Sequence, residues 1–400
     1  MWYGPLNLLK MPARNHQKWS KVPEKILPGE YVDSRIYSDK QIFEEEIDKI
    51  FKKVWTPVCH ESELPDTYSF RTMTIAREPV IVIKDINNNI KSFINIQYKH
   101  DRYCPQIGVV FKNNPSGCFK EMPDYKKLGL KKLNCEIKYG GFVWVTLDDK
   151  IEKSVEEWAA GAFDCMQKSL DSEPLEVFHY HKAIIPTNYK LWHDTNSEFY
   201  HDYLHYHNRV TGFNDSYFAR KELGFDNGHV NVGSFEVQYD QYDGFESRED
   251  LSFPHLPTNH WEMIDFFPGV NFNLRGSALR CDIMTPLSPD SVMIEFRGLG
   301  LKSDTPEERL TRIRHHNSIW GPFGRNLHED LIAVTTQQGS MNEYAEPRRI
   351  LHGRHELDAD GDPTIHDEEG MRHFYDEWGK RLNRCPGNPD LSYKKLHYPN

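Results

Sequence analysis

The 400-residue chain has no long hydrophobic run, a deficit of basic residues and only scattered cysteines. Because no stretch of about 18 apolar residues occurs, the sequence predicts no membrane-spanning helix. Its first residues also lack the small-residue cleavage site of a signal peptide. The seven cysteines are odd in number and widely spaced, which favours reduced thiols in a cytoplasmic protein over a disulfide framework. The formal net charge of -11 disfavours nucleic-acid binding through a phosphate patch, while metal ions and cationic electron-transfer partners remain compatible with it.

Several motifs that would indicate a chemistry are also missing. The sequence contains no HExxH zinc signature, no glycine-rich phosphate loop and no dinucleotide-binding fingerprint. No cysteine is followed by a histidine two or three residues later, and no internal repeat occurs. The chain is long enough for two domains, and its 13% aromatic residues are sufficient for a large core.

Residues 188–209 (NYKLWHDTNSEFYHDYLHYHNR) contain the most informative polar side chains. The segment has neither Gly nor Pro, so we expect one continuous helix. On such a helix His201 and His205 share a face with Glu198 and Asp194. Two imidazoles one turn apart can bind a metal ion, with carboxylates as a third ligand or as partners of the ligands. A solvated polar face is the alternative. The expected packing face of this helix consists of Phe199, Tyr203 and Tyr206.

The rest of the chain predicts an α+β protein. The start is rich in proline, and we expect residues 1–35 to be irregular. Apolar periodicity and turn residues indicate short strands, including a hairpin, in residues 70–96, 142–148, 228–239 and 260–300. Helical spacing of apolar residues indicates helices in residues 39–53, 152–170, 305–320, 325–338 and 367–383. Pro306 directly after Thr305 supports the start of the third of these helices.

Residues 321–339 (GPFGRNLHEDLIAVTTQQG) place Glu329 and Asp330 at the start of a helix. With the motif E-x-Y-H-x-x-x-H after NYKL, this segment resembles the catalytic domain of Rieske-type non-heme iron aromatic-ring-hydroxylating oxygenases, large (alpha) subunit. The stretches VWTPVCHESELPD, EPVIVIKD, KYGGFVWVTLDD and HFYDEWGKRLN agree with this resemblance, in order. It covers roughly residues 40–385.

The resemblance implies a mononuclear iron(II) bound by two histidines and one carboxylate, with open positions for dioxygen. His201 matches the first histidine and Asp330 matches the carboxylate, although an acid in a first helical turn is also favoured by the helix dipole. The spacing of some members selects His205 as the second histidine, while the usual spacing would select Tyr206. His207 is our second choice for that ligand.

Two acids are expected to support the iron. In the family an Asp hydrogen-bonds a ligand histidine and bridges to the cluster of the neighbouring subunit, and here Glu198 takes its place. Asp194 lies on the same face of the expected helix, and we predict both acids as catalytic residues. The residues after Trp261 (EMIDFFPGVNFNL) are expected to line part of the substrate pocket.

The family's N-terminal module holds a [2Fe-2S] cluster through Cys-x-His and Cys-x-x-His, and this chain lacks those pairs. In the corresponding segment (FINIQYKHDRYCPQIGVVF), Gln97 and Lys99 replace the first pair, Ile107 replaces the last histidine, and Cys104 alone remains. One thiolate cannot hold a cluster that needs four ligands. We therefore expect electrons to come from the Rieske cluster of another alpha-type subunit.

The sequence thus predicts a cluster-free oxygenase subunit. Residues 1–39 would pack on the catalytic domain, residues 40–150 would form a degenerate Rieske-like all-β domain, and residues 151–400 would form a helix-grip catalytic domain with a curved antiparallel sheet. Iron(II) would activate O2 to hydroxylate an organic substrate, which we expect to be aromatic. The implied assembly is a trimer-based hetero-oligomer with a cluster-bearing alpha-type subunit and a small beta subunit, served by a reductase or ferredoxin through that partner.

Other interpretations stay open. The Glu-x-x-His at residues 198–201 is half of a di-iron bundle motif, but no second copy occurs. A subunit without a cluster can also be a non-catalytic structural or regulatory paralogue, although the survival of the iron ligands favours catalysis. Two other metal sites are disfavoured. A zinc site of His201, His205 and His207 is disfavoured by helix geometry. A loop site of His100, Cys104 and Cys118 is disfavoured because its sequence pattern is weak.

Overall fold

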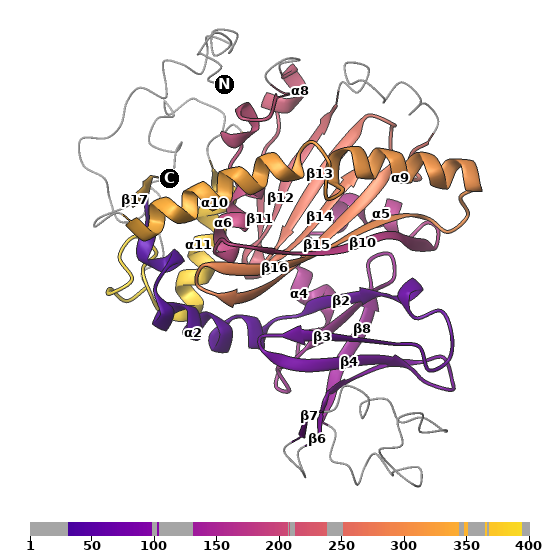
Figure 1. The fold of residues 1–400 in the computed structure, drawn as a ribbon, viewed down its shortest axis with the longest axis horizontal. Coiled ribbons are helices and arrows are strands. Elements are labelled where there is room, and N and C mark those ends of the chain that lie inside the picture. Colours follow the sequence, from indigo (N-terminus) through magenta and orange to yellow (C-terminus); the bar gives the residue numbers. More distant parts are fainter. Residues whose placement is uncertain are drawn as a thin grey trace.

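The computed structural model describes residues 31–97, 102–103, 131–206, 208, 213–237, 251–343, 348–350, 365 and 368–393. Within them the chain forms two large antiparallel sheets, two two-stranded sheets and the helices that cover the large ones (Figure 1), which confirms the predicted α+β class. None of the helices in these ranges has the length and hydrophobicity needed to span a bilayer. Gln97 is described in its backbone only; outside the described residues lie Lys99, His100, Cys104, Ile107, Cys118 and His207.

The smaller sheet contains six strands in the order β2-β9-β8-β5-β4-β3. Apolar residues such as Val80 and Val82 point into its core, and the hairpin expected at residues 86–89 joins β4 to β5. This sheet confirms the predicted strands between residues 70 and 148. The strands are β2 (Thr56–His60), β3 (Phe70–Ile75), β4 (Glu78–Lys84), β5 (Ile90–Ile94), β8 (Lys132–Lys138) and β9 (Phe142–Thr146), and a separate pair is β6 (Ile96–Gln97) with β7 (Arg102–Tyr103).

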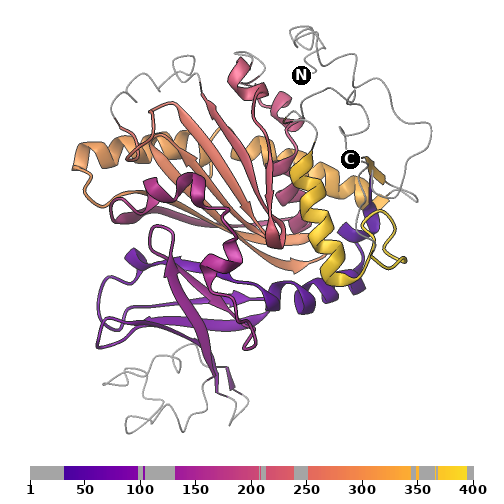
Figure 2. The same ribbon diagram turned by 180° about the vertical axis from the view of Figure 1, so that it is seen from behind.

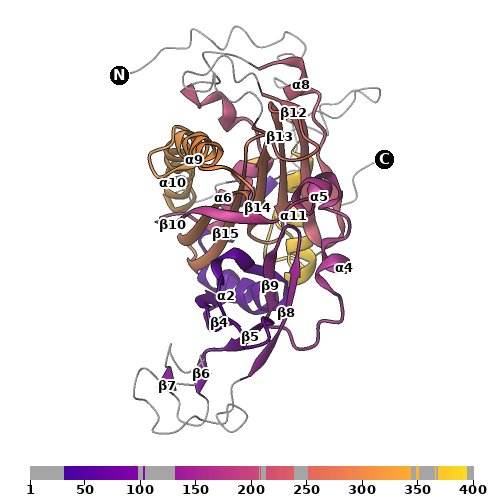
Figure 3. The same cartoon turned by 90° about the vertical axis from the view of Figure 1, so that its right-hand side faces the viewer.

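The larger, curved sheet contains seven strands in the order β10-β16-β15-β14-β13-β12-β11. Figure 3 shows α9 and α10 on one side of it, and Figure 2 shows α11 (yellow) with α4 and α5 (magenta) on the other. The strands are β10 (Leu175–Ile185), β11 (Leu223–Phe225), β12 (His229–Glu236), β13 (His260–Phe266), β14 (Val270–Arg275), β15 (Ala278–Ser288) and β16 (Ser291–Leu301). The helices are α2 (Lys40–Lys49), η3 (Phe51–Lys53), α4 (Val155–Ala159), α5 (Asp164–Leu170), α6 (Tyr189–Ser197), α8 (Asp215–Phe218), α9 (Pro306–Trp320), α10 (Leu327–Glu343) and α11 (Glu369–Leu382).

Capping residues in the sequence predict the start of one helix correctly, but two predicted helices are shorter than expected. The start of α9 is as predicted, because the Thr305 side chain accepts the Glu308 amide and the Glu308 carboxylate accepts the Thr305 amide, with Pro306 as first residue. The single helix predicted for residues 152–170 is wrong. Ala160 adopts a left-handed conformation (φ 52°) that ends α4 before α5 begins.

The single helix predicted for residues 188–209 is also wrong. Helix α6 ends at Ser197, and Glu198 is extended (φ -119°, ψ 132°). Its carboxylate then accepts the amides that open the 3-10 turn η6 (His201–Tyr203). The predicted packing face fails with the helix, because exposure rises through Phe199, Tyr203 and Tyr206.

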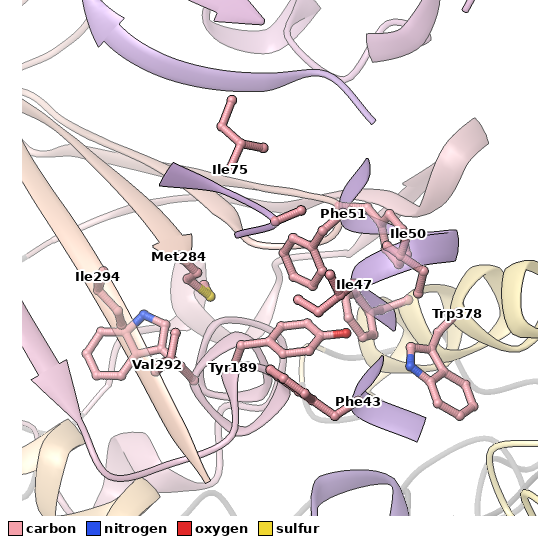
Figure 4. Close-up of a cluster of buried hydrophobic side chains, with 14 of the residues drawn as sticks. Phe43, Ile47, Ile50, Phe51, Ile75, Tyr189, Met284, Val292, Ile294 and Trp378 are labelled. Atoms are coloured by element: carbon pink, nitrogen blue, oxygen red, sulfur yellow. The ribbon is translucent and has the colours of Figure 1, made fainter. Parts of the chain in front are cut away.

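A buried joint connects the two sheets to the helix that precedes the metal-ligand candidates. Figure 4 shows Phe43 of α2, Tyr189 of α6 and Trp378 of α11 in one apolar cluster with residues of β15 and β16. Inside it, Lys190 Nζ lies 2.6 Å from Glu46 Oε1, and both side chains are fully buried. The position of α6 is therefore fixed by helices from both ends of the chain.

The described end of the N-terminal segment is ordered, contrary to the expectation for residues 1–35. β1 (Tyr31–Asp33) pairs with β17 (Arg348–Ile350), and η2 (Ser34–Tyr37) follows it directly. The Asn188 amide nitrogen donates to the Tyr37 carbonyl. This segment thus contacts the start of α6.

Candidate metal centre

Three side chains from two segments that are far apart in the sequence come together in space. His201 lies in η6, His205 follows it, and Asp330 lies in the first turn of α10. Asp330 Oδ1 lies 3.0 Å from His205 Nε2 and 3.6 Å from His201 Nε2. One nitrogen or oxygen from each of the three lies within 4.8 Å of the others. The structure therefore brings together the predicted ligands, although not on a common helix.

The far side of each imidazole is held by a carboxylate. His201 Nδ1 lies 2.7 Å from Glu198 Oε1, and His205 Nδ1 lies 2.7 Å from Glu329 Oε2. If each Nδ1 carries the donated proton, each Nε2 lone pair faces Asp330, which is the arrangement that orients histidine ligands in metal sites. The sequence pointed to Glu198 but gave Glu329 no role; its only signal was its place beside Asp330.

The charges at this centre match a divalent cation. Burial alone would lower the pKa of both imidazoles, but the carboxylates outweigh it: Asp330 and Glu329 raise the pKa of His205 to about 11, and Glu198 raises that of His201 to about 9. Asp330 Oδ1 is buried and has no hydrogen-bond partner of normal geometry among the described residues. Two imidazoles and one carboxylate form the donor set of mononuclear iron(II) oxygenases, and a bound metal would replace the protons on Nε2.

Asp194, the other predicted catalytic acid, is not brought to this centre. It is fully buried on α6, where Oδ1 accepts a hydrogen bond of 2.8 Å from Tyr375 and Oδ2 accepts one of 3.1 Å from Tyr37. Tyr206, which the usual family spacing would make a ligand, is exposed, and its amide donates to Glu329. The structure therefore places His205, rather than Tyr206, beside Asp330. Asp194 instead contacts Tyr37 and Tyr375.

A cavity of about 110 Å³ opens onto the candidate ligands. His201, His205 and Asp330 form one part of its wall. Met263 and Asn273, which lie in the stretch after Trp261, form another part, as predicted. Since both aromatic and polar side chains line it, the cavity suits a small substrate that has both apolar and polar parts.

Comparison with known proteins agrees with this geometry. Residues 171–384 match the family model described as "Ring hydroxylating alpha subunit (catalytic domain)". The chain is 57% identical to the methanesulfonate monooxygenase hydroxylase subunit alpha of Methylosulfonomonas methylovora, covering 96% of this chain and 98% of that one. It is 33% identical to the 2-aminobenzenesulfonate 2,3-dioxygenase subunit alpha of an Alcaligenes species, covering 90% and 96%.

Solved structures show the same fold. The naphthalene 1,2-dioxygenase of a Rhodococcus species superposes with a TM-score of 0.69 at 17% identity, covering 88% of this chain and 94% of that one. A quaternary ammonium Rieske monooxygenase superposes with a TM-score of 0.64 at 17% identity, covering 90% and 98%. The chain is therefore an oxygenase subunit with a mononuclear non-heme iron catalytic domain, and it belongs to the ring-hydroxylating alpha subunits of the Rieske oxygenases.

Proposed function

We propose that this subunit hydroxylates a small organic sulfonate at an iron(II) held by His201, His205 and Asp330. The observation that supports it most is the convergence of both Nε2 atoms on the buried Asp330 Oδ1. A solvated polar face would not bury these groups, and a capping acid would not face two imidazoles. The open part of the donor set leaves room for dioxygen beside the substrate cavity.

In this proposal the iron supplies the activation of dioxygen, and the chain supplies its surroundings. Glu198 and Glu329 accept the Nδ1 protons of the two ligand histidines and so hold the Nε2 atoms towards the metal. Asp330 contributes the anionic ligand. The aromatic side chains that line the cavity would pack against the carbon part of the substrate.

The substrate class comes from the relatives. The two relatives named above act, by name, on methanesulfonate and on 2-aminobenzenesulfonate. An aromatic ring is present in only one of these substrates, and the sulfonate is present in both. We therefore replace the expected aromatic substrate with a sulfonate, and the methanesulfonate relative, at 57% identity, directs the choice to an alkanesulfonate.

Electrons have to come from elsewhere. Inserting one oxygen atom of O2 into a C–H bond and reducing the other to water consumes two electrons and two protons. The segment that corresponds to the family's cluster loops has one cysteine and no matching histidine pair. We propose that residues 40–150 serve as scaffold, that a cluster-bearing alpha-type subunit of a hetero-oligomer delivers the electrons, and that a ferredoxin or reductase supplies that subunit.

The test begins with the iron and acid-labile sulfide content of the purified chain. We expect about one iron per chain without sulfide, and loss of that iron in the His201→Ala and Asp330→Ala variants. Replacing the exposed His255 by Ala is the matched control and should leave the iron in place. Labile sulfide, or iron that stays bound in both ligand variants, would contradict the proposal.

Activity is then measured after co-expression with a cluster-bearing alpha-type subunit and its reductase. Oxygen consumption that depends on methanesulfonate is the expected result. An iron-free chain that nevertheless assembles with the partner would establish the non-catalytic paralogue instead.

A further inference from the structure

Arg220 is a buried cation in the wall of the substrate cavity. It follows the short helix α8, and only 2% of it is exposed. It lines the same cavity as His201 and His205. A guanidinium is rarely buried without a carboxylate, so its surroundings indicate what it binds.

Four aromatic rings surround the Arg220 guanidinium. Its central carbon lies 4.3 Å from the ring centroids of Phe199 and Tyr217, 4.6 Å from that of Phe235 and 4.9 Å from that of Trp261. These rings stabilise the positive charge through their faces. Phe199, Phe235 and Trp261 carry no hydrogen-bond acceptor, and the hydroxyl of Tyr217 donates to Asp202.

The hydrogen bonds of Arg220 are incomplete. Nε donates to the Tyr217 carbonyl at 3.2 Å, but Nη1 and Nη2 are buried and have no partner among the described residues. Leaving such donors unpaired in a protein interior is costly. Two adjacent, unpaired guanidinium nitrogens are the geometry that binds two oxygens of one oxyanion.

Asp202 and Glu222 lie near Arg220, but neither forms an ion pair with it. Asp202 accepts a hydrogen bond of 2.8 Å from the Tyr217 hydroxyl and lies beside His201. Burial raises the pKa of Glu222 well above its ordinary value, which favours its neutral form. The described part of the chain contains no ion pair to Arg220, whereas the neighbouring cavity residue Arg280 is paired with Asp282 at 2.7 Å.

We infer that Arg220 binds the sulfonate group of the substrate. This inference rests on the proposed function, which names the substrate as a sulfonate. Two sulfonate oxygens would accept from Nη1 and Nη2, inside the aromatic rings, and the carbon chain would extend towards the metal ligands. The cavity of about 110 Å³ is smaller than the cavity of about 150 Å³ that accommodates benzene. Its size therefore fits a short alkanesulfonate better than an arenesulfonate.

Binding of radiolabelled methanesulfonate to the purified chain, measured by equilibrium dialysis, tests this assignment without any electron donor. We expect Arg220→Gln to weaken binding about a hundredfold, because it removes one member of a buried charged pair. Arg220→Lys keeps the charge but loses the paired donors, and should weaken binding about tenfold. The exposed Arg314→Gln variant is the matched control and should bind like the unmodified chain.

Competition experiments then separate charge from shape. Unlabelled methanesulfonate should displace the label, while dimethyl sulfone, which has similar shape but no charge, and the larger benzenesulfonate should not. Unchanged methanesulfonate affinity in both Arg220 variants, or equal competition by dimethyl sulfone, would overturn the inference. Should Arg220→Gln not fold, the lysine variant and the competition series decide the question.

The same preparations distinguish this inference from the proposed function. A chain that retains its iron but does not bind methanesulfonate refutes the role of Arg220 and leaves the metal site intact. Arg220-dependent binding without methanesulfonate oxidation, when the cluster-bearing partner is present, refutes the proposed function and supports the sulfonate site.

Discussion

Replacing Glu329 by Gln removes the charge that holds His205 while nearly preserving the shape of the side chain. Losing such a partner of a metal-ligating histidine costs about tenfold to a hundredfold in metal affinity, or about 1.4 to 2.8 kcal/mol. Because Glu329 and Glu198 differ in solvent exposure, we expect their losses of metal affinity to lie at opposite ends of that range. The Glu329 side chain is 23% exposed and that of Glu198 is 6% exposed, so solvent screens the first bond more strongly. We expect about tenfold for Glu329→Gln and nearly a hundredfold for Glu198→Gln.

The measurement is an anaerobic titration of the metal-free chain with iron(II) against a coloured chelator. Thermal unfolding of each variant, followed by circular dichroism, verifies that the fold persists. Glu343→Gln, at the exposed end of the same helix α10, is the matched control and should not change the affinity. If Glu329→Gln binds iron as tightly as that control, the 2.7 Å contact does not orient His205 and the reasoning fails.

Two further predictions concern stability. Glu46→Gln or Lys190→Met alone should lower the free energy of unfolding by about 3 kcal/mol or more, because each leaves a buried charge unpaired, whereas the double variant should recover most of the loss; additive losses in urea unfolding would contradict this. His229 donates to the Trp158 carbonyl, and burial lowers its pKa to about 3. The unfolded chain therefore binds more protons below pH 6.5, and stability should fall by about 1.5 kcal/mol between pH 6.5 and 5. The His229→Gln variant should lose that pH dependence, and an unchanged pH profile would refute it.

The sequence predicted which residues come together better than it predicted the local structure that carries them. His201, His205 and Asp330 were identified from residue type, spacing and a family resemblance, and these signals do not depend on a continuous helix. The partner Glu329 was missed because an acid in a first helical turn is usually explained by the helix dipole. Only its contact with His205, from a distant segment, reveals its role.

The break after α6 could not be predicted from the absence of Gly and Pro. The residues before it are poor helix formers, since Asp, Thr, Asn and Ser side chains compete for backbone hydrogen bonds. Their actual partners come from remote segments: Asp194 binds Tyr375, and Ser197 donates to Asp265 at 2.8 Å. By contrast, α9 and the strands expected in residues 70–96, 142–148, 228–239 and 260–300 are confirmed, because period-two patterns and capping residues are local signals. The sequence analysis did not predict β2, β8 and β10.

The strand order of the larger sheet sets when the metal site can form during folding. Strands β11 to β16 pair in sequence order, so each pairs with its neighbour in the chain, but β10 pairs with β16, the last strand of this sheet to be made. Closing that long loop is the slow, entropically costly step of such a topology. His201 and His205 lie between β10 and β11, while Asp330 follows β16. Iron binding therefore comes after translation of the sheet, and iron stabilises the closed topology by mass action.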